Sequence, residues 1–230
     1  MRIQTTIVAL AAGAFLSSTA LADVSFYTIG SRLATRLYDD DSGQLEAYER
    51  VFSGELDLLA GQVFGDEPGY RDPPGIFSSS GTLTISIRAA LRRWTGSGFG
   101  STTDRLNIQQ FGGAVSVYTP AADPANPDTD PLTHFNWNVG PGELHEHPDY
   151  YLVDSTLSGN GAPGIYLAEF HAEVNVDGLA RSYPFFQLFN YGQTADDLAA
   201  ATDYTEENIV PAGPTLGIFA CLLPLRRRRR

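Results

Sequence analysis

Apolar and polar residues alternate in short stretches along most of the chain, and clusters of glycine, proline, asparagine, aspartate and serine separate these stretches. A period of two is the pattern of a β-strand that buries one face, and such clusters mark the turns between strands. The alternation is clearest at residues 82–88, 134–139 and 164–176. The pattern predicts an all-β fold, which we interpret as an antiparallel β-sandwich of the jelly-roll or immunoglobulin-like kind with long loops.

Other segments complete this prediction. Residues 105–111 and 114–118 flank a Gly-Gly pair and are expected to form a hairpin. The nearly continuous aromatic run at 183–190 fits a strand that is buried on both faces. A threonine N-cap with acids in the first turn opens 194–201 and predicts one short C-terminal helix. Residues 44–51 fit a second short helix, whereas residues 48–52 fit the start of a strand equally well.

The expected β-sandwich domain spans residues 23–204. A loop at 119–131 is rich in proline and aspartate, as a linker would be. It either joins two β halves, 23–119 and 132–192, or forms a long crossover within one sandwich. We favour the single sandwich, and the sequence shows no convincing internal repeat.

The first 22 residues have the composition of a signal peptide. A basic start at Arg2 precedes an apolar run at 7–16, and Ala20-Leu21-Ala22 is the small-x-small pattern that signal peptidase recognises. The apolar run is too short for an ordinary membrane anchor. We therefore expect cleavage by signal peptidase before Asp23, which predicts an exported protein.

The C-terminal tail, residues 205–230, has the pattern of a transient inner-membrane anchor. An apolar segment at 215–225 is followed by five arginines at 226–230, and arginines favour the cytoplasmic side of the bilayer. The tail resembles the PEP-CTERM sorting tail, although the Val-Pro-Glu-Pro motif of that family is replaced here by Val-Pro-Ala-Gly-Pro. The resemblance implies processing by an exosortase and delivery to the cell surface, the extracellular matrix or the medium. Its sorting signal would be Val210, Pro211, Pro214, Arg226 and Arg227.

The net charge of the chain narrows the classes of partner that it can bind. All 27 acidic residues but only nine of the 15 basic ones lie between Arg2 and the terminal arginines, so this part carries a formal charge of −18. Such a charge excludes nucleic acid as a partner and favours attraction of cations. The one cysteine, Cys221, lies in the tail, so the exported domain is expected to fold without a disulfide.

The strongest candidate chemistry is the triplet His145-Glu146-His147. On an extended backbone residues two apart point the same way, so both imidazoles share a face with Glu143. Histidine and carboxylate are the ligands that Zn²⁺ and similar divalent cations take in proteins. His134 and His171 lie on the polar sides of their predicted strands and are further candidate ligands. The other interpretation is that all four are solvated or hydrogen-bonded histidines.

Other motifs are weaker. The acidic run at 39–43 lacks the full pattern of a calcium loop and fits an acidic turn. The sequence contains no Gly-x-Ser-x-Gly elbow, no His-Glu-x-x-His and no phosphate loop, which favours a protein without enzymatic activity. The many acidic residues and aromatics such as Trp94 and Tyr150 keep a polysaccharide-active hydrolase or a carbohydrate-binding module as the alternative.

Several motifs along the mature chain are similar to those of uncharacterised exported PEP-CTERM proteins from planctomycete-like bacteria. They include Thr35-Arg-Leu-Tyr, Ala90-Leu-Arg-Arg-Trp, Leu144-His-Glu-His-Pro and Ser182-Tyr-Pro-Phe-Phe. His134-Phe-Asn-Trp, the His-x-His and Pro163-Gly-Ile-Tyr also resemble surface-anchored repeat proteins associated with metal-uptake transporters in actinobacteria. That second resemblance implies metal handling at the cell envelope.

The sequence thus predicts a non-enzymatic protein of the cell surface or extracellular matrix that binds a divalent metal through a His-x-His site. His145 and His147 would be the ligands, completed by His171, His134 or Glu143. Signal peptidase and an exosortase would be its processing partners, and extracellular polysaccharide is a further candidate partner.

Overall fold

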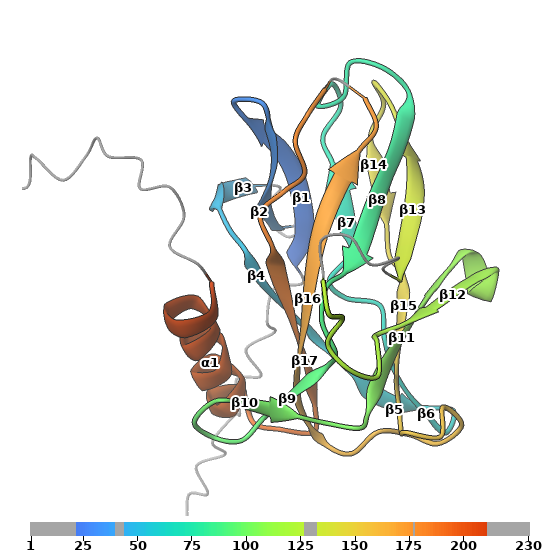
Figure 1. Ribbon diagram of the computed structural model, residues 1–230, viewed down its shortest axis with the longest axis vertical. Helices are drawn as coiled ribbons and strands as arrows, with labels where there is room; N and C mark the ends of the chain where they lie inside the picture. Colours follow the sequence, from blue (N-terminus) through green and yellow to red (C-terminus); the bar gives the residue numbers. More distant parts are fainter. Residues whose placement is uncertain (1–21, 40–43, 127–132, 177, 211–230) are drawn as a thin grey trace, which may run out of the picture.

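The computed structural model describes residues 22–39, 44–126, 133–176 and 178–210, and the structural statements below concern these residues. Their strands form three mostly antiparallel sheets (Figure 1). The all-β sandwich expected from the alternating pattern is confirmed. Pro211, Pro214, Arg226 and Arg227 of the sorting signal lie outside the described residues, as does the acidic run at 40–43.

The first sheet carries the strands on which the candidate site is built. Its order is β14 (Leu144–Glu146), β7 (Tyr70–Asp72), β1 (Ala22–Ile29), β2 (Arg32–Asp39) and β3 (Gln44–Tyr48). The pairing of β1 with β7 is parallel, while β14 and β7 are antiparallel. Segments from the beginning and the middle of the chain therefore lie side by side at this edge.

The central sheet has seven strands. One row consists of β10 (Phe99–Ser101), β9 (Arg92–Trp94), β16 (Gly164–Val174), β17 (Phe185–Tyr191) and β4 (Val51–Glu55). In addition, β8 (Gly81–Ile87) pairs with both β16 and β13 (His134–Val139). Strands from 23–119 and from 132–192 are thus hydrogen-bonded neighbours within one sheet.

The third sheet lies at the lower right of Figure 1. Its order is β12 (Val115–Tyr118), β11 (Arg105–Gln110), β15 (Asp149–Val153), β6 (Gln62–Gly65) and β5 (Asp57–Leu59). The hairpin expected around the Gly-Gly pair is confirmed, because β11 and β12 pair antiparallel on either side of a short 3₁₀ turn, η1 (Phe111–Gly113).

One hydrophobic core joins the three sheets. Its fully buried rings and aliphatic side chains come from all of them, including Phe26, Tyr70, Phe135, Tyr150 and Phe170. Burial of these apolar surfaces is the main favourable contribution to folding. The alternation read from the sequence decides which side chains enter this core.

The aromatic run near residue 185 is buried on both faces, as the sequence predicts. Phe185 and Phe189 enter the main core, whereas Phe186 and Leu188 pack on the opposite face under the helix α1 (Ala195–Tyr204). Figure 1 shows α1 on the side of the central sheet away from the third sheet. The second apolar face of the sheet is therefore covered by the predicted helix.

The helix begins with a full capping box, because Thr194 and Asp197 exchange hydrogen bonds between side chain and backbone. It continues as one π-helical turn, η2 (Thr205–Ile209), in which Thr205 is buried. The folded part thus extends beyond residue 204, where the sequence placed the end of the domain. Within the described residues, no helix has both the length and the apolar character needed to cross a bilayer.

The segment 44–51, for which a helix and a strand were both open, contains β3 and the start of β4. Helix formation there would have removed the edge strand that pairs with β2. Strand pairing, which depends on residues far away in the sequence, decides between the two alternatives.

Candidate metal centre

The two histidines of the His-x-His motif converge. His145 lies in β14 and His147 follows directly after its end, so their side chains leave the same face of the sheet. The Nε2 atoms of the two rings are 2.9 Å apart. The His145 and His147 side chains are 41% and 31% exposed, so both rings can be reached from solvent.

A third candidate ligand comes from the first strand. Asp23 lies in β1, and β7 alone separates this strand from β14 in the first sheet. Oδ2 of its fully buried carboxylate is 3.0 Å from Nε2 of His145. One ligand atom from each of Asp23, His145 and His147 lies within 4.8 Å of the others.

These distances fit a divalent cation. Zinc binds histidine nitrogen and carboxylate oxygen at about 2.0–2.2 Å, so two ligand atoms of a tetrahedral site lie about 3.3 Å apart. The separations of 2.9 and 3.0 Å in this group are close to that value. Two imidazoles and one carboxylate are a common set of three protein ligands for zinc, with a fourth position left for water.

Contacts with Glu67 and Asp66 hold the ring of His147 in one orientation. Its Nδ1 atom lies 3.3 Å from Oε1 of Glu67 and 3.2 Å from the carbonyl oxygen of Asp66. A ring that donates from Nδ1 to a carboxylate or carbonyl presents Nε2 to a metal as an acceptor. The hydrogen bond with Glu67 raises the pKa of His147 to about 9. Metal binding there must therefore displace a proton, and affinity should fall as the pH is lowered.

Gly69 provides the space for the site. A Cβ atom on this residue would lie 2.5 Å from Oδ1 of Asp23 and 2.7 Å from Nδ1 of His147. Its amide also donates to Oε2 of Glu67 at 3.0 Å. Only glycine at this position allows the carboxylate and the ring to approach each other.

Gly69→Ala is expected to weaken zinc affinity about tenfold, because the new methyl group pushes two ligands apart and removes none of them. The cost in folding stability should be about 1–2 kcal/mol, as for other insertions of one methyl group into a packed site. A competition titration against a chromophoric chelator measures the affinity. Gly142→Ala is the matched control, because a Cβ there meets nothing within 4 Å. Equal affinities in the two variants would show that Gly69 does not shape the site.

The remaining predicted ligands lie elsewhere. His134 in β13 and His171 in β16 each pair with Ser86 of β8, so they belong to the central sheet rather than to the sheet of His145. Glu143 lies near His145, but its Oε1 is 2.5 Å from Nη2 of Arg71. The group of three ligand atoms thus contains His145 and His147 but none of these residues.

The environment of His171 corrects one expectation. The alternation in its strand placed it on the wet side of the sheet, yet it is only 3% exposed. Its Nδ1 lies 3.0 Å from Nη1 of Arg88, whose Nε donates to Glu169. Arg88 and Glu169 lie beside His171, which is therefore buried although its strand pattern places it on the polar face.

Sequence reasoning missed Asp23 and Glu67. Both are acidic residues in a chain with many of them, and no local spacing connects either to the histidines. The connection is made by the pairing of β1 with β7 and of β7 with β14. The position of Asp23 at the start of the first strand carried no signal of its own.

Asp72, next to the site in β7, is buried and carries an unusual carboxyl group. One oxygen accepts a hydrogen bond from the amide of Leu144, and Oδ2 has no hydrogen-bond partner within the described residues. Burial raises the pKa of Asp72 to about 6. The folded state therefore holds this proton more tightly than the unfolded chain does.

The Asp72 carboxyl contributes stability that is fully present below about pH 4 and lost as the pH rises through about 6, because its folded pKa is raised. The side-chain amide of an Asp72→Asn variant stays neutral at every pH. Going from pH 4 to pH 8, the stability of this variant relative to the unsubstituted protein should therefore rise by up to about 3 kcal/mol. Urea unfolding at both pH values measures this difference. A difference that does not change with pH would contradict the buried, protonated carboxyl.

Comparison with known proteins identifies no family. No protein-family model matches the sequence, and no curated protein is significantly similar to it.

Proposed function

We propose that this protein is an exported, non-enzymatic protein of the cell surface or extracellular matrix that binds a divalent cation, with zinc as the best fit. Asp23, His145 and His147 are the ligands. The observation that carries this proposal is the convergence of one carboxylate oxygen and two imidazole nitrogens within 4.8 Å. Glu67 acts from outside this group by orienting His147.

The burial of the Asp23 carboxylate supports a role in binding. Removing a carboxylate from water is unfavourable unless a nearby positive charge compensates for it. Here the compensating groups face the carboxylate from the solvent side, where a cation can reach them. A divalent cation between the carboxylate and the two rings would supply a stronger and permanent compensation than a protonated imidazole.

Features of the sequence support export of the protein. The leader that ends at Ala22 and the basic tail fit an exported protein. Removal of the leader before Asp23 would also leave a free α-amino group on the residue that supplies the carboxylate. Asp23 would then be both the N-terminal residue of the processed protein and a ligand of the metal.

Zinc uptake tests the proposed function. The protein, purified after export from a bacterial host, is exposed to zinc, dialysed and analysed for metal content. We expect about one zinc per chain, and almost none for the double variant His145→Ala, His147→Ala. His134→Ala is the matched control, because this exposed histidine belongs to the central sheet, and it should keep its zinc. Equal metal contents in the double variant and the unsubstituted protein would refute the proposal.

A further inference from the structure

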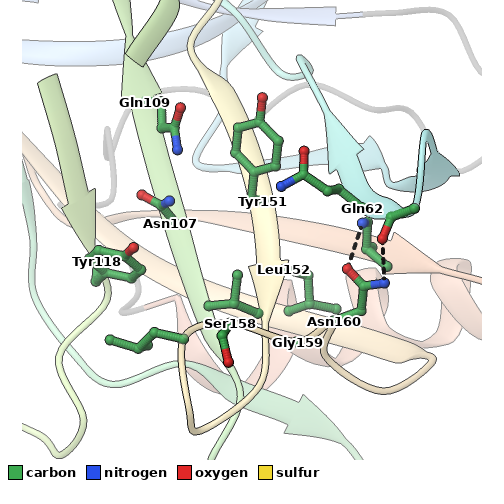
Figure 2. A pocket seen from close by; sticks show the side chains of 13 residues that line it. Gln62, Asn107, Gln109, Tyr118, Tyr151, Leu152, Ser158, Gly159 and Asn160 are labelled. Carbon is green, nitrogen blue, oxygen red and sulfur yellow. Dashed lines mark hydrogen bonds between the residues drawn. The ribbon is translucent and has the colours of Figure 1, made fainter. Parts of the chain in front are cut away.

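A second site of a different kind lies on the outward face of the third sheet. Figure 2 shows a pocket between β11, β15 and β6 that is closed at one side by the loop at 157–160. Its volume is about 320 Å³, which is in the range of pockets that hold small ligands. The pocket shares no residue with the metal centre.

The floor of the pocket is a row of aromatic and amide side chains. Asn107 of β11 pairs directly with Tyr118 of β12 on one side and with Tyr151 of β15 on the other. Directly opposite residues in neighbouring strands share a face, so the two tyrosines flank the amide. Neighbouring strands are about 4.8 Å apart, which separates the two tyrosine backbones by about 10 Å. Tyr151 also packs against Phe64 of β6, with ring centroids 5.2 Å apart, although Phe64 itself does not line the pocket.

Polar groups of the wall are held in place by hydrogen bonds. Oδ1 of Asn160 accepts from the amide of Val63, and Nδ2 of the same residue donates to the carbonyl oxygen of Gly61 (Figure 2). On the floor, Oδ1 of Asn107 accepts from the hydroxyl of Ser116 at 2.8 Å. Gln62 and Gln109 add two more amide side chains to the lining. A ligand therefore meets an ordered set of neutral donors and acceptors.

Hydrogen bonds within the loop that closes the pocket also hold that loop in place. Oδ1 of Asp154 accepts hydrogen bonds from the amides of Thr156 and Gly159. Leu157, at the turn of this loop, adopts a left-handed backbone with φ of 62°, which is costly for a side chain of this size. Its side chain lines the pocket and is 38% exposed. The loop thus presents an apolar edge to the pocket at the cost of local strain.

Among the described residues, no charged side chain lines the pocket, although the folded part of the chain is strongly acidic. Tyrosine rings offer flat apolar faces with a hydroxyl at the end, and amides offer one acceptor and two donors. This combination suits a ligand that has apolar C–H faces and many neutral hydroxyls. The lining itself supplies no counter-ion for a charged ligand, and the nearby Arg105 guanidinium lies 5.3 Å from the centroid of the Tyr118 ring.

We propose that this pocket binds neutral saccharide, with one sugar ring against Tyr151 and a neighbouring ring toward Tyr118. Asn107, Gln62 and Asn160 bind the hydroxyls. The site acts independently of the metal centre, because the two lie on different sheets. The protein would then hold a neutral extracellular polysaccharide with one face and a cation with another.

Calorimetric titration with cellotriose, xylotriose, mannotriose and maltotriose tests the proposal, with trigalacturonate as the charged comparison. At least one neutral trisaccharide should bind with a dissociation constant below about 1 mM, and trigalacturonate should bind at least tenfold more weakly. Tyr151→Ala should weaken binding at least tenfold. Tyr48→Ala is the control, because this exposed tyrosine lies on the first sheet.

A second variant keeps the test decisive if Tyr151→Ala does not fold. Gln62 is exposed at the rim of the pocket, so Gln62→Trp fills the pocket without removing core contacts and should also abolish binding. Binding should remain unchanged in EDTA and in the His145→Ala, His147→Ala variant. Absence of binding by all four neutral sugars, or equal binding by the Gln62→Trp variant, would overturn the saccharide site. Neither result would affect the proposed metal site.

Discussion

Phe170→Ala is expected to lower the free energy of unfolding by about 3–5 kcal/mol. This ring is fully buried in β16, stacked at 5.6 Å on Phe185 and 6.5 Å from Phe135. Its removal leaves a cavity that the surrounding strands cannot close, because β16 pairs on both sides in the central sheet. Urea unfolding followed by circular dichroism measures the loss.

The control for this experiment is Leu58→Ala, which shortens an aliphatic side chain that is 60% exposed. Its cost should stay below about 1 kcal/mol, as is usual for surface substitutions. If Phe170→Ala were no more destabilising than Leu58→Ala, the three sheets would not share the core described above.

Zinc is expected to raise the free energy of unfolding by about 2.7 kcal/mol when its free concentration is 100 times the dissociation constant. Asp23→Ala should remove most of this stabilisation, because the remaining pair of imidazoles is a much weaker site than three ligands that include a carboxylate. Thermal unfolding with zinc and with EDTA measures the effect. The difference between the two conditions, rather than the absolute melting temperature, reports on the metal.

Glu143→Gln provides the matched control for the Asp23 substitution. Glu143 is the carboxylate that the sequence placed beside the histidines, but it pairs with Arg71 and is 40% exposed. The variant should retain the full zinc effect. If Asp23→Ala kept the zinc effect and Glu143→Gln lost it, the carboxylate ligand would be Glu143, as the sequence alone predicts, and Asp23 would not be a ligand.

Local alternation was a reliable guide to the strands and their faces. The bounds expected for 134–139 are those of β13, whose Phe135, Trp137 and Val139 are buried while the residues between them are exposed. The same period of two places His145 and His147 on one face, so the centre of the candidate site could be predicted from the sequence. These features depend only on neighbours in the chain.

Features that depend on pairing between distant segments could not be predicted. Asp23 of β1 reaches His145 because β1 pairs in parallel with β7, and β7 is the neighbour of the edge strand β14. Glu143 forms an ion pair with Arg71 of the neighbouring strand, and His171 forms a hydrogen bond with Arg88. The sequence identified His145, Glu143 and His171 as chemical groups but not Asp23, and the sheet order decided the partner of each.

The pocket of the third sheet shows the same limit. Asn107, Tyr118 and Tyr151 come from β11, β12 and β15, with β13 and β14 between the last two in the chain, and only their register makes them one row. Their alternation within each strand is visible in the sequence, but the order of the strands is not. The aromatic residues that the sequence offered for stacking on sugars, Trp94 and Tyr150, are not among those that line this pocket.

Diffraction at the zinc absorption edge from crystals grown with zinc tests the metal centre most directly. The ligand set predicts one strong anomalous peak about 2.0–2.2 Å from Nε2 of His145, Nε2 of His147 and a carboxylate oxygen of Asp23. A peak beside His134 or His171, or none within bonding distance of these three residues, would contradict the site.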